Sequence, residues 1–261
     1  MHSVRSFLLA ATVLLGASTP AQVRFHDETY AVQLQSGVLY GTGATGYSGT
    51  PGVKNLTADV YSPVGFPSPT RPALLLVHGG SFSSGNSTSP DMVQAAQYFA
   101  ARGWVCVSIN YRLQGDDPPA PSWVALFGGL AGRAGHAAAV DAKRALRWMR
   151  ANAASLGIDP NAIGGIGHSA GAFCVLMAAV TDPEDFANDA GTAVPDQNPT
   201  QSGALNACVE VSGDIALWGG DIDANDAPLM IVHGIADTTV PFTSAETIRD
   251  LCVAAPLEHE F

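Results

Sequence analysis

The stretch Ala162-Ile163-Gly164-Gly165-Ile166-Gly167-His168-Ser169-Ala170-Gly171 decides how this chain folds, because a short apolar run leads directly into a serine between small residues. Residues 167–171 match the pattern G-x-S-x-G, which is typical of a nucleophilic serine on a sharp turn from strand to helix. The glycines allow the tight turn, and the amide of Ala170 at the helix start can face a developing negative charge. We therefore predict that Ser169 is a nucleophile. A glycine-rich turn with an incidental serine is the alternative.

Other short apolar runs on both sides of this stretch indicate a sheet that is covered on both faces. They lie at residues 73–77, 104–109, 162–166, 205–211 and 229–232, and they lack the alternation of half-exposed strands. Helix-like segments separate them at residues 90–102, 136–154, 170–180 and 243–254. Strands separated by helices predict an α/β fold with a mostly parallel sheet, helices on both faces and a ligand site beyond the carboxyl ends of the strands.

The ends of several elements carry recognisable signals. Ser89 is a predicted helix N-cap with Pro90 at the first helical position, and Thr243 with Glu246 forms a predicted capping box. Alternating segments at residues 30–40 and 55–61, joined by a turn-rich stretch, predict an N-terminal antiparallel hairpin.

Two segments do not fit the rhythm of strands and helices. Residues 114–135 are rich in proline, glycine and aromatic residues, and residues 181–203 are rich in aspartate and proline. We predict that both are long loops. They are either solvated connections or walls of a substrate cleft, with Trp123 and Phe127 as candidate apolar contacts.

The first 21 residues are typical of a secretory signal peptide. A basic start containing Arg5 precedes an apolar core and a small-residue stretch that reaches Ala21, after which we expect cleavage. The alternative is a membrane anchor, but the apolar core is well short of the roughly 20 residues that span a bilayer. We therefore predict a secreted or periplasmic protein with one α/β domain at residues 22–261.

The composition narrows the set of partners. The chain has 12 lysine and arginine residues against 23 aspartate and glutamate residues, which gives a formal net charge of −11. Because such a surface repels phosphate backbones and anionic lipids, we expect no nucleic-acid partner and, after removal of the leader, no membrane partner. The oligomeric state stays open.

The cysteines also bear on the chemistry. Four of them are widely spaced without a C-x-x-C pair, which argues against zinc: Cys106, Cys174, Cys208 and Cys252. In an oxidising compartment they can form two disulfides, and buried thiols are the alternative. We expect neither a metal nor an organic cofactor.

A second motif, His78-Gly79-Gly80-Ser81-Phe82, directly follows the apolar run at residues 73–77. Acyl transfer passes through a tetrahedral oxyanion, which backbone N–H groups stabilise. Because glycines let a ligand approach the backbone closely, we predict the amides of Gly80 and Ser81 as donors, with Gly79 serving the turn. We expect a structural role for His78. A plain turn is the alternative reading of this motif.

A third motif, His233-Gly234-Ile235-Ala236-Asp237, follows the apolar run at residues 229–232. A carboxylate in this place can hold an imidazole in the correct tautomer and stabilise it as a cation. We predict Asp237 as this acid and Asp214 as the reserve acid. A turn-capping aspartate is the alternative.

Together these motifs resemble the α/β-hydrolase superfamily, specifically its esterases of the hormone-sensitive-lipase and carboxylesterase kind. The resemblance covers about residues 71–261 and includes residues 109–113 and the stretch 141–163 that leads to the serine. It implies an α/β-hydrolase fold with Ser169 as nucleophile, Asp237 as acid, and Gly80, Ser81 and Ala170 as the oxyanion hole. Ser81 stands where the family usually has a third glycine.

The resemblance also implies a catalytic histidine after the strand that follows the acid's helix. Residues 257–261 have the pattern of the start of that strand, and His259 is the only histidine after Asp237. As a residue within a strand, its side chain would point sideways rather than toward Ser169. We therefore expect a C-terminally incomplete domain whose histidine lies beyond Phe261, with His259 as the alternative base.

The sequence thus predicts a secreted serine carboxylic-ester hydrolase that acts through an acyl-enzyme. By family analogy, its substrates would be short-chain, aryl or polysaccharide-linked acyl esters, whether small molecules or attached to a polymer. The alternatives are a peptidase of the prolyl-oligopeptidase type and a non-catalytic binding protein on a hydrolase scaffold.

Overall fold

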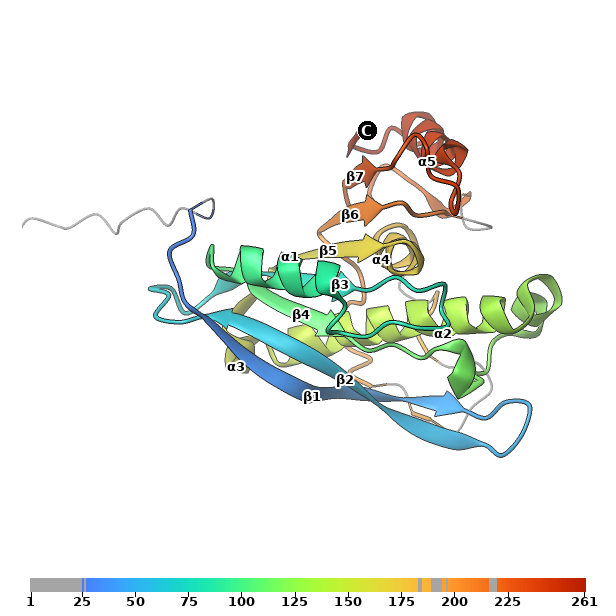
Figure 1. The fold of residues 1–261 in the computed structure, drawn as a ribbon, viewed down its shortest axis with the longest axis horizontal. Helices are drawn as coiled ribbons and strands as arrows, with labels where there is room; N and C mark the ends of the chain where they lie inside the picture. Colours follow the sequence, from blue (N-terminus) through green and yellow to red (C-terminus); the bar gives the residue numbers. More distant parts are fainter. Residues whose placement is uncertain (1–24, 26, 183–184, 189–193, 196, 216–219) are drawn as a thin grey trace, which may run out of the picture.

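A computed structural model describes residues 25, 27–182, 185–188, 194–195, 197–215 and 220–261, leaving aside the side chains at 123 and 125–128. The predicted leader and the predicted contacts of Trp123 and Phe127 therefore lie outside what the structure describes. The described residues form one twisted sheet with helices on both faces (Figure 1).

The sheet has eight strands in the order β1-β2-β4-β3-β5-β6-β7-β8. Their bounds are β1 Val32–Thr45, β2 Gly52–Pro63, β3 Arg71–Val77, β4 Val105–Ile109, β5 Ile158–His168, β6 Ala207–Val211, β7 Leu229–Val232 and β8 His259–Glu260. β1, β2 and β4 pair in antiparallel fashion, whereas β4, β3, β5, β6, β7 and β8 run parallel. The predicted α/β fold with a mostly parallel sheet and an N-terminal antiparallel hairpin is confirmed.

The helices are α1 Pro90–Ala100, α2 Ser122–Ala151, α3 Ala153–Leu156, α4 Ala170–Val180 and α5 Phe242–Ala254, with a 3₁₀ turn at Gln114–Asp116. The prediction of a loop at residues 114–135 is wrong from Ser122 onward, because α2 begins there and is interrupted only at Gly129. Glycine and proline suggested a loop. Small residues here instead permit close packing, since a Cβ at Gly135 would lie 3.4 Å from the ring of Phe82.

Two predicted helix caps differ from those observed. Pro90 starts α1 as predicted, but the Ser89 hydroxyl makes no cap and accepts a hydrogen bond from the Asn86 amide at 3.3 Å. The capping box at Thr243 is wrong, because α5 already begins at Phe242. The carbonyl of Thr243 is part of the helix and accepts the hydroxyl of Thr247 at 2.8 Å.

Two apolar cores lie on opposite faces of the sheet, and the pleat of β3 contributes to both. Leu74 and Leu76 pack with Met92 of α1, whereas Leu75 and Val77 belong to the larger core. Helices α2, α4 and α5 supply this larger core on the other face. Burial on both faces explains why the strand lacks alternation in the sequence.

The four cysteines are buried free thiols, which decides between the two alternatives for them. Burial raises the pKa of the Cys252 thiol to about 11, so this thiol stays protonated near neutral pH. Within the described part of the chain, no helix is long and apolar enough to cross a bilayer.

Candidate active site

The strand register brings the ends of four strands to one edge of the sheet. Val77 pairs with Gly167, and His168 pairs with Val211. Val211 in turn pairs with Val232. The loops that follow β3, β5, β6 and β7 therefore start side by side. These loops carry all three motifs predicted to hold chemistry.

Ser169 occupies a strained turn between β5 and α4. Its φ of 54° and ψ of −118° lie in a region that residues with a side chain rarely adopt, and its amide donates to the Val211 carbonyl at 2.8 Å. A Cβ at Gly171 would lie 2.0 Å from the Val77 carbonyl, and one at Gly167 would lie 2.2 Å from the Gly171 carbonyl. Both glycines are required because strand, turn and helix pack directly against β3.

His78 and Tyr111 fix the loop after β3 through hydrogen bonds and ring stacking. The Nδ1–H of His78 donates to the Gly79 carbonyl at 2.6 Å, and its ring stacks on Tyr111 with centroids 4.2 Å apart. The Tyr111 hydroxyl donates to the His78 carbonyl at 2.9 Å. Burial lowers the pKa of His78, which favours the neutral ring. His78 has the structural place that we predicted for it.

Three backbone amides of the predicted oxyanion hole have no hydrogen-bond acceptor within the described part of the chain. They are the amides of Gly80, Ser81 and Ala170. Gly80 has φ 114°, and a Cβ there would lie 2.2 Å from the Ser84 carbonyl. Ser81 has φ 52°, a left-handed conformation that glycine adopts more easily. A serine at this place therefore keeps the turn at a cost in strain.

Asp237 sits in a tight turn after β7 and is ionised. Its Oδ1 accepts the amides of Thr239 at 2.8 Å and Val240 at 3.0 Å. These two amides lower the pKa of the carboxyl, and the hydroxyl of Ser212 contributes in the same direction. The reserve acid, Asp214, instead accepts the hydroxyl of Ser244 at 2.7 Å and does not line the cleft described below.

A buried carboxyl stands behind this turn and was not predicted from the sequence. Glu210 on β6 is fully buried, and its Oε2 accepts the Gly213 amide at 2.7 Å. Burial raises its pKa to about 7. His233 lies close enough to interact electrostatically with Glu210, and its Nε2–H donates to the Val240 carbonyl at 2.9 Å. The one signal in the sequence that could have indicated this buried carboxyl is that a glutamate interrupts an apolar strand.

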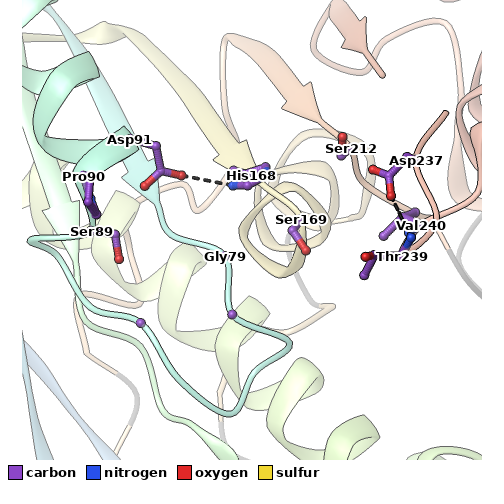
Figure 2. A pocket seen from close by; sticks show the side chains of 12 residues that line it. Gly79, Ser89, Pro90, Asp91, His168, Ser169, Ser212, Asp237, Thr239 and Val240 are labelled. Carbon is purple, nitrogen blue, oxygen red and sulfur yellow. Dashed lines mark hydrogen bonds and ion pairs between the residues drawn. The ribbon is translucent and has the colours of Figure 1, made fainter. Parts of the chain in front are cut away.

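Ser169, Asp237, Gly79 and Gly80 line one cleft of about 420 Å³. Its other lining residues are Gly85, Ser89, Pro90, Asp91, His168, Ser212, Thr239 and Val240. Figure 2 shows Ser169 in the middle, with Asp91 and His168 on one side and Ser212 and Asp237 on the other. Ser81 and Ala170 are not among the lining residues, although each adjoins one. The cleft has the size of a small-molecule site.

No described histidine bridges Ser169 and Asp237. His259 pairs with Leu229 at the start of β7, whereas Asp237 follows the other end of that strand, and the His259 Nδ1 contacts the Leu257 carbonyl at 2.9 Å. The alternative that His259 is the base is therefore wrong. The ring of His168 is directed toward Asp91. The described residues also contain no cluster of three or more histidine, cysteine or acidic side chains that could hold a metal ion.

Comparison with known proteins agrees with this geometry. Residues 53–185, about half of the chain, match the model of the carboxylesterase family. This match contains Ser169 and the glycine loop, and it ends before Asp237. The chain belongs to the carboxylesterase family.

Two of the curated relatives that the chain matches are named as esterases. The chain is 33% identical to esterase LipQ of Mycobacterium tuberculosis over 132 residues, which cover 50% of this chain and 27% of the relative. It is 34% identical to carboxylesterase 3B of Mus musculus over 125 residues, which cover 46% of this chain and 19% of the relative. The matches thus span about a quarter or less of these relatives.

A solved structure resembles the fold over most of its length. Esterase 2 of Thermogutta terrifontis, in a form phosphorylated by paraoxon, superposes with a TM-score of 0.66 at 24% identity, covering 88% of this chain and 80% of that one. At this identity the likeness supports the α/β-hydrolase fold.

Proposed function

We propose that this carboxylesterase-family protein is a secreted serine hydrolase that cleaves carboxylic esters through an acyl-enzyme on Ser169. The observation that carries the proposal is the strained turn that presents Ser169 in one cleft with Asp237 and the Gly79–Gly80 loop. As substrates we propose short-chain, aryl or polysaccharide-linked esters.

The proposed reaction has two halves. The Ser169 oxygen attacks the ester carbonyl carbon, and an imidazole oriented by Asp237 takes the hydroxyl proton. The oxyanion binds the amides of Gly80, Ser81 and Ala170, and each such donor contributes about 3 kcal/mol to the transition state. The imidazolium then protonates the alcohol as the C–O bond breaks. A water molecule, activated by the same imidazole, releases the acid and restores Ser169.

His233 Nε2 lies 3.8 Å from the Asp237 Oδ2 but donates to the Val240 carbonyl at 2.9 Å, so we place the catalytic imidazole outside the described residues. The surroundings of Asp237 and the direction of β8 support this proposal. A carboxylate offers about four acceptor positions, and Thr239, Val240 and Ser212 occupy three around Asp237. Strand β8 runs parallel to β7, so its direction leads toward the edge of the sheet where the cleft lies.

The test is hydrolysis of p-nitrophenyl acetate by the wild type and by Ser169→Ala, with and without added imidazole. We expect the variant to lose at least roughly a thousandfold in rate, because the acyl-enzyme cannot form. Free imidazole also hydrolyses this ester by itself, so the expected rescue is a larger rate increase in the wild type than in Ser169→Ala. Ser155→Ala, an exposed serine on α3, is the matched control. Equal rates for Ser169→Ala and the wild type with imidazole present would reject the esterase proposal.

One observation favours a second candidate function. Because no described imidazole reaches Ser169, the cleft can also serve a non-catalytic binding protein. A fluorophosphonate probe separates the two functions, since it labels only an activated serine. Labelling at Ser169 supports the esterase. The absence of labelling, together with retained ester binding, supports the binding protein.

Secretion is proposed from the leader alone. The test is the N-terminal sequence of the exported protein, which should begin at Gln22. Recovery of a protein that still carries residues 1–21 inside the cell would contradict it.

A further inference from the structure

The cleft contains a second carboxylate–imidazole pair, which the proposed reaction does not use. Asp91 lies in the first turn of α1, and His168 is the last residue of β5. The His168 Nδ1 lies 3.0 Å from the Asp91 Oδ2, and both side chains are about half exposed, at 48% and 44%. Figure 2 shows this pair across Ser169 from Asp237, while the Ser169 hydroxyl points away from it.

The pair fixes which hydrogen bonds His168 can make to a ligand. An ionised carboxylate only accepts hydrogen bonds, so the Nδ1 facing Asp91 carries the proton. In the neutral ring Nε2 is then an acceptor, and it has no partner in the described part of the chain. The carboxylate behind the ring strengthens this acceptor. The pair therefore offers an oriented acceptor to a ligand group that has a proton to donate.

The rest of the cleft wall points to the same kind of ligand. Among the described lining residues, hydroxyls come from Ser89, Ser212 and Thr239 in addition to Ser169, and only Pro90 and Val240 have apolar side chains. No phenylalanine, tyrosine or tryptophan is among them. The carbon atoms of the wall can cover an acyl chain, and the hydroxyls offer a hydroxylated group partners on both sides of Ser169.

The charge of the cleft also restricts which ligands can bind. Asp91 and Asp237 place a carboxylate on either side of Ser169, and the chain as a whole has a formal charge of −11. An anionic ester would be repelled from this cleft. A neutral polyol would not.

We propose that Asp91 and His168 form a substrate-binding element that accepts a hydrogen bond from a hydroxyl of a neutral polyhydroxylated ester, such as an acylated glycerol or sugar. This inference rests on the proposed esterase function, because it names the substrate class of the same cleft. His168 contacts the substrate, and Asp91 is a positioning residue that fixes the ring.

The test measures binding rather than turnover. NMR titration of Ser169→Ala compares glycerol monoacetate with propyl acetate, which lacks the free hydroxyls. We expect glycerol monoacetate to bind about tenfold more tightly, the effect of one good hydrogen bond. Adding His168→Phe should abolish this preference. Adding His168→Gln, which keeps an acceptor, should restore part of it.

Further titrations identify which part of the ester carries the hydroxyl that contacts His168, and they control for changes in charge. Propyl glycolate carries its hydroxyl in the acyl part, so a comparison with glycerol monoacetate shows which side of the ester faces His168. Asp91→Asn should reduce the preference, because it removes the charge behind the ring. Asp250→Asn, at an exposed aspartate on α5, should leave the preference unchanged.

Equal affinities for the two acetates in Ser169→Ala, or an unchanged preference in the folded His168→Phe variant, would overturn the inference. Its failure differs from failure of the esterase proposal. Hydrolysis that depends on Ser169 without any hydroxyl preference refutes only the inference. A binding preference without hydrolysis or labelling by the wild type refutes only the esterase.

Discussion

The turn around Ser169 and the turn around Asp237 line the same cleft, but different forces hold them. The serine turn is buried between strands, and a single added methyl group at Gly171 would collide with β3. The acid turn is exposed, with Ile235 at 83% exposure and open space around Gly234. The nucleophile is therefore positioned by packing of distant segments, whereas the acid is positioned by hydrogen bonds within its own loop.

This difference has a physical reason. Ser169 adopts a strained backbone conformation, which persists only where the surrounding structure over-determines it. The carboxylate of Asp237 accepts its backbone hydrogen bonds from Thr239 and Val240, which are close neighbours in the chain. Substitutions around Ser169 should thus lower the stability of the fold, and substitutions around Asp237 should lower mainly the rate of ester hydrolysis.

The largest effect on stability is expected from Gly171→Ala. Its Cβ would lie 2.0 Å from the buried Val77 carbonyl, so strand or helix must move, at a cost of at least about 4 kcal/mol. Urea denaturation measures this loss. Gly234→Ala is the matched control, because nothing lies within 4 Å of the added methyl group. Similar midpoints for the two variants would contradict the comparison.

A smaller effect, dependent on pH, is expected from Glu210→Gln. The raised pKa of about 7 means that the folded state holds the Glu210 proton more tightly than the unfolded state. The free energy of unfolding of the wild type should therefore fall, by about 3 kcal/mol, as pH rises from roughly 4.5 to 7. Above pH 7 this contribution should stay constant. The variant should lack this decline, because its side chain does not ionise.

The measurement is urea denaturation at a series of pH values. Glu246→Gln, at a more exposed glutamate on α5, is the control and should keep the wild-type decline. A Glu210→Gln curve parallel to that of the wild type would show that this carboxyl ionises normally.

The smallest effect on stability is expected from Asp237→Asn, since the exposed turn can keep its hydrogen bonds through the amide oxygen. Thermal melting should show little change near pH 7. Ester hydrolysis should fall at least roughly a hundredfold, because an amide no longer favours the tautomer of the imidazole that the reaction needs. A large shift in the melting temperature with retained activity would show that Asp237 stabilises the fold and takes no part in the reaction.

Much of the fold was predictable because local patterns and the tertiary structure agree. The run before Ser169 becomes β5, and residues 170–180 form α4 as predicted. The prediction failed at residues 114–135, where composition indicated a loop. There, packing against Phe82 and Phe173 selects a helix for small residues.

The site was predictable only in part, for a similar reason. The three motifs follow strands, so a parallel sheet must bring them to one edge. The pair of Asp91 and His168 was not predictable, because 77 residues separate its members and neither belongs to a shared pattern. Glu210 was missed because only its depth in the sheet distinguishes it from a surface glutamate.

The sequence by itself determined most strand and helix types and the acid's own hydrogen-bonded turn, because these depend on neighbours within a few residues. The tertiary structure alone decided that the four cysteines are separate thiols, that His259 lies at the wrong end of β7, and that Asp91 meets His168. Such facts depend on strand order and register, which are set by burial of the whole sheet rather than by any local pattern.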